Sequence, residues 1–376
     1  MRPPSRPPSR PPSRLPSLTG LRFWAALLVV LYHLSRQLGE LPLISPLVWY
    51  GRSGVTFFFV LSGAVLAWTY DGARVPVHVF LRRRLARIWP LHALSTALSL
   101  AAYAAIGAAV PVGAALWSLP LLHAWLPATA KGGNPASWSL GDEAWFYLLL
   151  PFLLALLTGR RLRAVAVACL LSGPLLWFAG AAVDDTALRS WLLDYLPLTR
   201  TPQFLLGVVL GLALRRGTAP RVPLLPAGLA VLAFHAALVP WHLAVPDQRW
   251  YGPWCASQLL AAPLFAALIA AAAQADLNGR RAFGQRPLVR LGEWSFAWYL
   301  VHEIGFRCWL AAYGRPDGTA VLLGVWLLLA GGSLALAAAL FRYVERPLER
   351  ALRAGPVVRL PRPRRDSAKA RQRSAV

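Results

Sequence analysis

The sequence predicts an all-α membrane protein, a bundle of about ten transmembrane helices with both termini in the cytoplasm. Of its 376 residues, 57% are hydrophobic and only 14% are charged, a balance typical of a polytopic membrane protein. The net charge of +24 comes from arginines in short loops and tails between apolar runs. This placement favours a lipid bilayer as the partner and argues against nucleic acid.

The two ends of the chain predict disordered cytoplasmic tails. Residues 1–17 repeat Arg-Pro-Pro-Ser three times and residues 351–376 are basic, compositions that cannot form a packed core. The transmembrane domain is expected over residues 18–350. No small-residue cleavage site follows the first apolar run, so we expect that run to be kept as a helix. The three cysteines are isolated in apolar segments, and we expect no metal site and no bound cofactor.

Ten apolar segments are long enough to span a bilayer, which takes about 20 residues each. They lie near residues 19–37, 53–71, 88–109, 138–158, 162–182, 201–215, 222–243, 253–274, 290–313 and 318–342. Residues 111–136, between the third and fourth spans, hold two tryptophans and a Gly-Gly-Asn turn. We expect this stretch to be an interfacial or re-entrant outer loop.

The orientation follows from the basic residues. With the N-terminus in the cytoplasm, the inner loops and tails collect 30 arginines and lysines, and the outer loops collect seven. Cytoplasmic loops of membrane proteins carry such an excess, so the count predicts an even number of spans with both ends inside.

The first span carries Arg22 and His33. Their spacing of eleven residues places both on one helix face, roughly 16 Å apart along the axis. Ionisable side chains in a spanning helix are costly and usually functional. The alternative is that Arg22 reaches the inner headgroups and His33 bonds a neighbouring helix.

Arg84, Arg87 and Pro90 lie at the inner mouth of the third span. Arg84 and Arg87 share a helix face, and the planar guanidinium group suits the phosphates of a nucleotide-bearing donor. The alternative is a basic loop that holds anionic lipid, which we prefer for Arg82 and Arg83.

The fourth span carries Ser139, Glu143 and Tyr147, which form one polar stripe on an apolar helix. A carboxylate buried beside a histidine can orient the imidazole and raise its basicity. Asp142 fits the alternative of an anion favoured by the helix dipole.

Together these stretches resemble the acyltransferase-3 family of integral membrane enzymes, which O-acylate sugars and glycosylated products, over most of residues 18–350. The similar motifs are Arg22…His33, Gly54-Val-Thr-Phe-Phe-Phe-Val-Leu-Ser-Gly63, Arg84…Arg87…Pro90, Ser139…Glu143…Phe146-Tyr147, Tyr299-Leu-Val-His302 and Tyr343-Val-Glu-Arg-Pro347. The small Ser62 and Gly63 would allow close helix packing. The run Gly141-Asp-Glu-Ala-Trp145 departs from the family pattern, and the resemblance leaves the acceptor open.

The resemblance implies a multi-pass enzyme of the plasma membrane, an acyltransferase that transfers groups other than aminoacyl groups. It would move a short acyl group from cytoplasmic acyl-CoA to a hydroxyl of a sugar-containing acceptor, either an envelope polysaccharide or a glycosylated secondary metabolite. His33 would be the general base and Glu143 its orienting partner. Arg84 and Arg87 would hold the donor phosphates, with Arg22 along the path.

The geometry expected for this chemistry places His33 and Glu143 in the outer half of the bundle, in contact directly or through one water. Ser139, Tyr147, Tyr299 and His302 would touch the acceptor or serve structure. The alternative function is a transporter or flippase of acylated or glycosylated substrates without transferase activity. Such a protein should have broken helices paired in two related halves, and the sequence has no such repeat.

Overall fold

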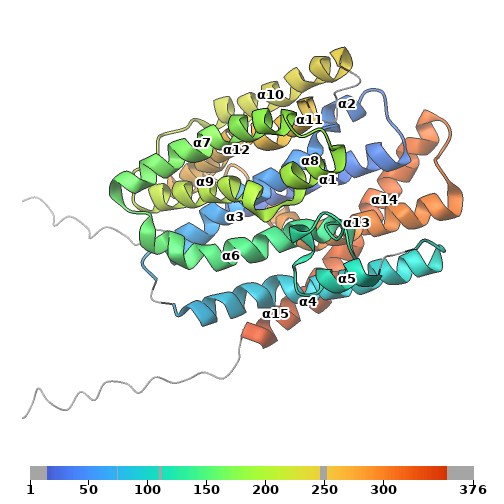
Figure 1. Ribbon diagram of the computed structural model, residues 1–376, viewed down its shortest axis with the longest axis horizontal. Helices are drawn as coiled ribbons and strands as arrows, with labels where there is room; N and C mark the ends of the chain where they lie inside the picture. Colours follow the sequence, from blue (N-terminus) through green and yellow to red (C-terminus); the bar gives the residue numbers. More distant parts are fainter. Residues whose placement is uncertain (1–14, 74, 110–111, 246–251, 354–376) are drawn as a thin grey trace, which may run out of the picture.

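The protein is described here by a computed structural model covering residues 15–73, 75–109, 112–245 and 252–353. Every regular element in these ranges is helical and none is a strand, which confirms the predicted all-α class. Eight helical segments are long and apolar enough to cross a membrane, as expected of a polytopic membrane protein. Figure 1 shows the long helices side by side in an elongated bundle.

The eight apolar segments contain most of the helices. They are formed by α1 (Pro16–Leu38), α2 (Ser45–Val48) with η1 (Gly51–Ser53) and α3 (Gly54–Tyr70), η3 (Pro135–Ser137) with α6 (Trp138–Leu156), α7 (Gly159–Ala181), α8 (Thr186–Ser190) with η4 (Trp191–Tyr195) and α9 (Pro197–Arg215), α10 (Leu224–Ala244), α11 (Gly252–Leu259) with α12 (Ala262–Leu277), and α14 (Thr319–Leu340) with η5 (Phe341–Glu345) and α15 (Arg346–Arg353). The short α5 (Val112–Ser118) and η2 (His123–Trp125) lie in the loop before α6.

Two further long helices coincide with the remaining two of the ten expected spans. α4 (Val77–Ala105) and α13 (Arg286–Tyr313) have 29 and 28 residues, which is more than a bilayer requires. Arginines and other polar side chains interrupt both, and neither is among the eight apolar segments. α4 begins eleven residues before the expected start of the third span at 88, so Arg84 and Arg87 are helical residues.

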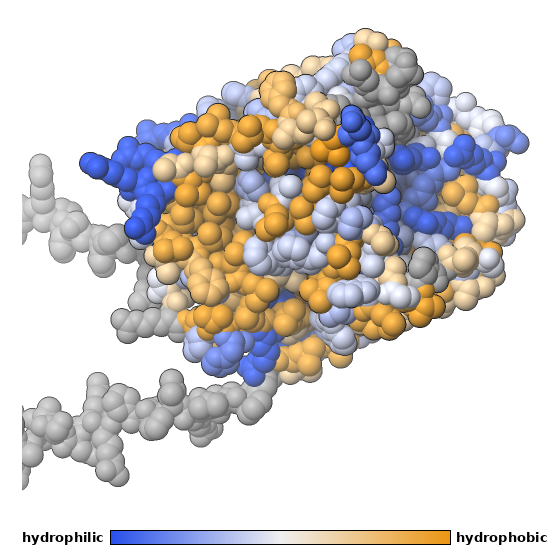
Figure 2. Space-filling view, viewed as in Figure 1, coloured by the Kyte–Doolittle hydropathy of each residue, from blue (hydrophilic) through white to orange (hydrophobic). Residues whose placement is uncertain are grey.

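The described helices extend slightly into the two stretches that were expected to be tails. α1 begins at Pro16 and α15 continues to Arg353, so short pieces of the two expected tails are helical. The remainder of both tails lies outside the described residues. We call the end of the bundle at which α1 begins the inner end, after the predicted orientation, and the opposite end the outer end. Figure 2 shows apolar residues over the middle of the molecule and hydrophilic residues gathered toward both ends.

Glycines set the closest helix contacts. A Cβ atom added at Gly63 of α3 would lie 2.1 Å from the carbonyl oxygen of Phe204, and one at Gly207 of α9 would lie 2.0 Å from that of Val60. Small residues at such interfaces let the helix backbones approach closely, which is the expected role of Gly63. Gly292 does the same for α13, where an added Cβ would lie 1.9 Å from the carbonyl oxygen of Thr19 on α1.

The loop of residues 112–137 packs into the bundle. Its side chains His123, Asn134 and Ser137 are fully buried, and Asn134 Nδ2 donates to the carbonyl oxygen of Leu300 in α13 at 2.7 Å. Burial also lowers the pKa of His123 to about 3, which favours the neutral imidazole. This loop fills the outer end of the bundle above the start of α6. The first residues of α6 therefore lie inside the bundle and not at its outer surface.

Candidate active site

His33 lies at the wall of a chamber at the outer end of the bundle. The chamber has a volume of about 590 Å³, within the usual range for small-molecule sites. His33 comes from α1, Tyr299 and Glu303 come from α13, and Arg52 comes from η1. His33 thus shares this chamber with three other polar side chains from two further elements. Among its lining residues in the described ranges, Arg22, Arg84 and Arg87 do not occur.

The second histidine of the sequence motifs, His302, contacts His33. Its Nε2 lies 3.1 Å from Nδ1 of His33, and its Nδ1 lies 3.1 Å from the carbonyl oxygen of Trp298. A carbonyl only accepts hydrogen bonds, so Nδ1 of His302 carries the hydrogen and Nε2 accepts.

The same argument assigns the hydrogen on His33. Its Nδ1 lies 2.9 Å from the carbonyl oxygen of Val29, so this nitrogen carries the hydrogen and shares it between Val29 and His302. Nε2 of His33 then holds the lone pair, and no hydrogen bond from the described residues reaches it. A histidine oriented through Nδ1, with a bare Nε2 at a cavity wall, has the arrangement of a general base.

Glu303 is one of the carboxylates in the wall of this chamber. It accepts hydrogen bonds from Gln37 at 3.0 Å and from Arg307 at 2.6 Å, and its negative charge acts on His33. Sequence reasoning missed Glu303, although an ionisable residue in a spanning helix is itself a signal of function.

Ser139 and Tyr299 form the next layer inward. The Ser139 hydroxyl lies 3.0 Å from the hydroxyl of Tyr299, and Tyr299 lies one turn inward of His302 on α13. The structure thus brings together four of the residues singled out in the sequence, with Tyr299 at the wall of the chamber and Ser139 behind it.

Glu143 belongs to a different group, which we call the inner arginine cluster. Glu143 accepts a hydrogen bond from Tyr147 at 2.8 Å, and the positive charges that act on it come from Arg22, Arg87 and Arg84. Within the described residues, neither a hydrogen bond nor an ion pair joins it to His33.

The expected direct contact of Glu143 with His33 is therefore wrong, and helix depth gives the reason. α6 begins inside the bundle, and Ser139 is already level with Tyr299. Glu143 lies one further turn inward on α6, which places it roughly 10 Å inward of His33 along the bundle.

Arg87 of the inner arginine cluster is paired within the protein. Its Nη1 lies 3.9 Å from Glu345 of η5 and 3.6 Å from Glu349 of α15, because η5 and α15 both pack against α4, as Figure 1 shows for α15. Arg84 stacks its guanidinium carbon 5.8 Å from the ring centre of Tyr70, and its Nε is buried without a hydrogen-bond partner in the described residues. Arg22, which is half-buried, lies within electrostatic range of Arg87, Glu345 and Glu143.

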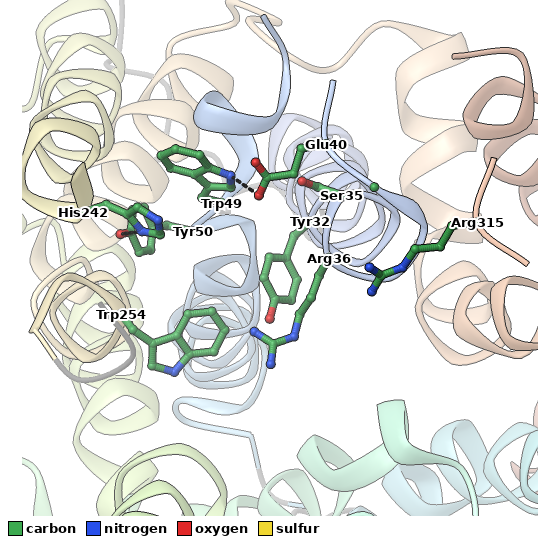
Figure 3. Close-up of a pocket in the computed structure, with 10 residues that line it drawn as sticks. Tyr32, Ser35, Arg36, Glu40, Trp49, Tyr50, His242, Trp254 and Arg315 are labelled. Atoms are coloured by element: carbon green, nitrogen blue, oxygen red, sulfur yellow. Dashed lines mark hydrogen bonds between the residues drawn. The ribbon is translucent and has the colours of Figure 1, made fainter. Parts of the chain in front are cut away.

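A second chamber of about 490 Å³ adjoins the first at the outer end (Figure 3). The two chambers share Tyr32, Arg36, Trp254 and Arg315 in their walls. In the second chamber Trp49 stacks on the ring of His242 at 4.2 Å and donates to Glu40 at 3.0 Å. In the described part of the chain, no group of three or more His, Cys, Asp or Glu residues is placed to hold a metal ion.

Comparison with known proteins identifies the family. Residues 15–342 match the model of the acyltransferase-3 family, which is described as an acyltransferase domain. The chain is 33% identical to acyltransferase MdmB of Streptomyces mycarofaciens over 393 residues, which cover 94% of this chain and 96% of that relative. No solved structure matches the chain. A transporter without transferase activity is thereby set aside. The chain belongs to the acyltransferase-3 family, and it is a multi-pass membrane enzyme that transfers acyl groups other than aminoacyl groups.

Proposed function

We propose that this enzyme moves a short acyl group from cytoplasmic acyl-CoA to a hydroxyl of a sugar-containing acceptor, with His33 as the general base. The observation that carries the proposal is the bare Nε2 of His33 at the wall of the outer chamber. An acceptor hydroxyl is a weak nucleophile until a base removes its proton. Val29 and His302 fix the hydrogen of His33 on Nδ1. Only Nε2 is then free to take the proton of the acceptor hydroxyl.

In the proposed reaction the acceptor oxygen attacks the thioester carbonyl carbon as its proton passes to Nε2 of His33. The carbon–sulfur bond then breaks, and the sulfur leaves with the proton returned by His33, which gives the ester and coenzyme A. Glu303, whose charge acts on His33, stabilises the imidazolium that forms in between.

The donor side of the proposal rests on the inner arginine cluster. Arg22, Arg84 and Arg87 gather where an acyl-CoA from the cytoplasm would arrive, and Glu143 and Tyr147 lie among them. Guanidinium groups bind phosphate through charge-assisted hydrogen bonds. We therefore assign Glu143 to the donor side, where it orients these arginines.

The acceptor side of the proposal rests on the outer chamber. Its walls combine the aromatic side chains Tyr32, Trp138, Tyr195 and Trp254 with charged groups. Aromatic faces attract the C–H face of a sugar ring, and charged groups accept or donate hydrogen bonds to its hydroxyls. An envelope polysaccharide or a glycosylated secondary metabolite at the plasma membrane would present such a ring at the outer end.

The test uses purified enzyme in proteoliposomes with labelled acetyl-CoA on one side and a panel of sugars and glycosides on the other. Mass spectrometry should find a product heavier by one acetyl group, and the His33→Ala protein should yield none. Transfer that required another donor, such as an acyl phosphate, would contradict the donor proposal. Transfer only to acceptors without sugar would contradict the acceptor proposal.

A further inference from the structure

Arg52 is a buried cation held in place by a carboxylate. It precedes α3 and is only 7% exposed, and its Nη1 lies 3.3 Å from Oδ2 of Asp194. Asp194 is itself fixed, because its carboxylate accepts from Gln258 at 3.0 Å and from Ser190 at 3.0 Å. The guanidinium group therefore has a set position before any substrate binds.

Three aromatic rings surround the same guanidinium group. Its central carbon lies 4.8 Å from the ring centre of Tyr195, 5.1 Å from that of Trp138 and 5.4 Å from that of Trp254. The ring faces attract the cation, and the near-complete burial of Arg52 lowers the local dielectric, which strengthens any interaction with a negative charge.

One nitrogen of Arg52 is left without a partner. Nη2 is buried and makes no hydrogen bond within the described residues. Arg52 also lines the outer chamber with His33, and its positive charge acts on His33. A buried donor without a partner costs free energy, and a substrate oxygen that displaced its surroundings and accepted from Nη2 would remove that cost.

The backbone on both sides of Arg52 packs against α1 on the inner side of His33, over the stretch from Ala25 to Tyr32. An added Cβ at Gly51 would lie 2.2 Å from the carbonyl oxygen of Leu28, and one at Gly54 would lie 2.6 Å from that of Ala25. Leu28 and Ala25 precede His33 by about 7 and 12 Å along α1. An acyl group that comes from the inner end reaches this level before it reaches an acceptor at the outer end.

We propose that Arg52 is a further catalytic residue, which binds the carbonyl oxygen of the acyl thioester and stabilises the negative charge that this oxygen gains during transfer. The inference rests on the proposed function. As the acceptor oxygen bonds to the carbonyl carbon, the π electron pair moves to the carbonyl oxygen beside Arg52 and the acceptor proton moves to His33. The pair then re-forms the carbonyl as the carbon–sulfur bond breaks. Cations placed where charge develops supply the largest single term in many enzymes.

The test measures coenzyme A release from acetyl-CoA with a thiol reagent, using water or the neutral methyl α-D-glucopyranoside as acceptor. Neither acceptor carries an anion, so a loss cannot come from a missing contact to an acidic sugar. Arg52→Gln should lower kcat by ~10²–10³-fold with the KM for acetyl-CoA nearly unchanged. Arg52→Lys keeps the charge beside Asp194 and should lose at least ~10-fold, because one ammonium cannot serve both Asp194 and the oxyanion.

Arg200→Gln is the matched control. Arg200 is also buried and also binds Asp194, through its backbone oxygen at 3.0 Å and its carboxylate at 3.7 Å, but it does not line the outer chamber. Its variant should lose thermal stability to a similar degree and keep kcat per folded molecule. A kcat within threefold of wild type in Arg52→Lys would overturn the inference even if Arg52→Gln fails to fold, and so would a higher KM at unchanged kcat. If the wild type releases no coenzyme A, the proposed function fails instead.

Discussion

The outer chamber and the inner arginine cluster both take residues from α1 and α6 but are prepared differently. In the outer chamber, His33 presents a bare nitrogen to a cavity of about 590 Å³. In the inner cluster, Arg87 is already paired with Glu345 and Glu349 at 3.9 and 3.6 Å. His33, the proposed base, is preorganised for the reaction. Arg87, which is proposed to bind the donor phosphates, is already paired with two carboxylates of the protein.

This difference separates two costs of the reaction. A preorganised base needs no rearrangement when the acceptor arrives, so its contribution should show in kcat. A paired arginine must exchange a carboxylate for a phosphate, so its contribution should show in the affinity for the donor. Mutations at the two ends should therefore change different kinetic constants.

The largest effect is expected at the outer end. His33→Gln removes the bare nitrogen and should lower kcat by ~10²–10⁴-fold, while the protein still accumulates in the membrane. The measurement is acyl transfer per folded molecule. His78→Gln is the control, because His78 is exposed near the start of α4, and it should keep full activity. Activity above a tenth of wild type in His33→Gln would mean that another group takes the proton.

Glu303 should follow with a smaller effect. Glu303→Gln removes the negative charge beside the imidazolium form of His33 and should lower kcat by roughly 10-fold, at an unchanged KM for acyl-CoA. Glu303→Asp should recover part of the rate, which a purely structural role would not predict. Glu143→Gln should instead alter the KM. The assignment of the two carboxylates is reversed if Glu143→Gln lowers kcat alone and Glu303→Gln does not.

Arg87 tests the inner end. Arg87→Gln should raise the KM for acyl-CoA by roughly 10-fold, or ~1.4 kcal/mol, for one lost charge-assisted contact, and kcat should change less. Arg84→Gln should act in the same way. Arg82 is exposed on the same helix, and Arg82→Gln should leave the KM unchanged. If all three variants bind acyl-CoA as tightly as the wild type, Arg84 and Arg87 do not bind the donor and instead hold anionic lipid.

The sequence predicted the helices and most residues of both clusters, because hydropathy and helical periodicity are local properties. The spacing of Arg22 and His33 placed both on one face, and the spacing of Tyr299 and His302 did the same on α13. Which distant helix faces meet is a matter of tertiary packing. The contact between His33 and His302 was therefore not predicted.

The error on Glu143 has a specific cause. Assigning it to the outer half assumed that α6 begins at the membrane surface, but the loop of residues 112–137 folds into the bundle and α6 begins deeper. Hydropathy shows that a loop is apolar and does not show how far it enters. Arg52 was likewise counted only as an outer basic residue, since Asp194 lies far away in the sequence.

The smallest expected effect comes from the internal partner of Arg87. Glu349 lies on α15, where it also pairs with Arg353, and its contact with Arg87 is partly exposed to solvent. If Glu349 competes with the donor phosphate for Arg87, Glu349→Gln should lower the KM for acyl-CoA. Partly exposed ion pairs contribute at most about 1 kcal/mol, so we expect a change of roughly two- to fivefold that weakens at high salt.

A double-mutant cycle decides whether this effect passes through Arg87. Competition predicts that Glu349→Gln lowers the KM in the wild type and has no effect once Arg87→Gln is present, because the carboxylate then has no cation to withhold. A KM that rises in Glu349→Gln would show the opposite role, in which Glu349 holds Arg87 in position for the donor. The contrast between a preorganised outer site and a self-paired inner site would then be lost, since both ends would be prepared before the substrates bind.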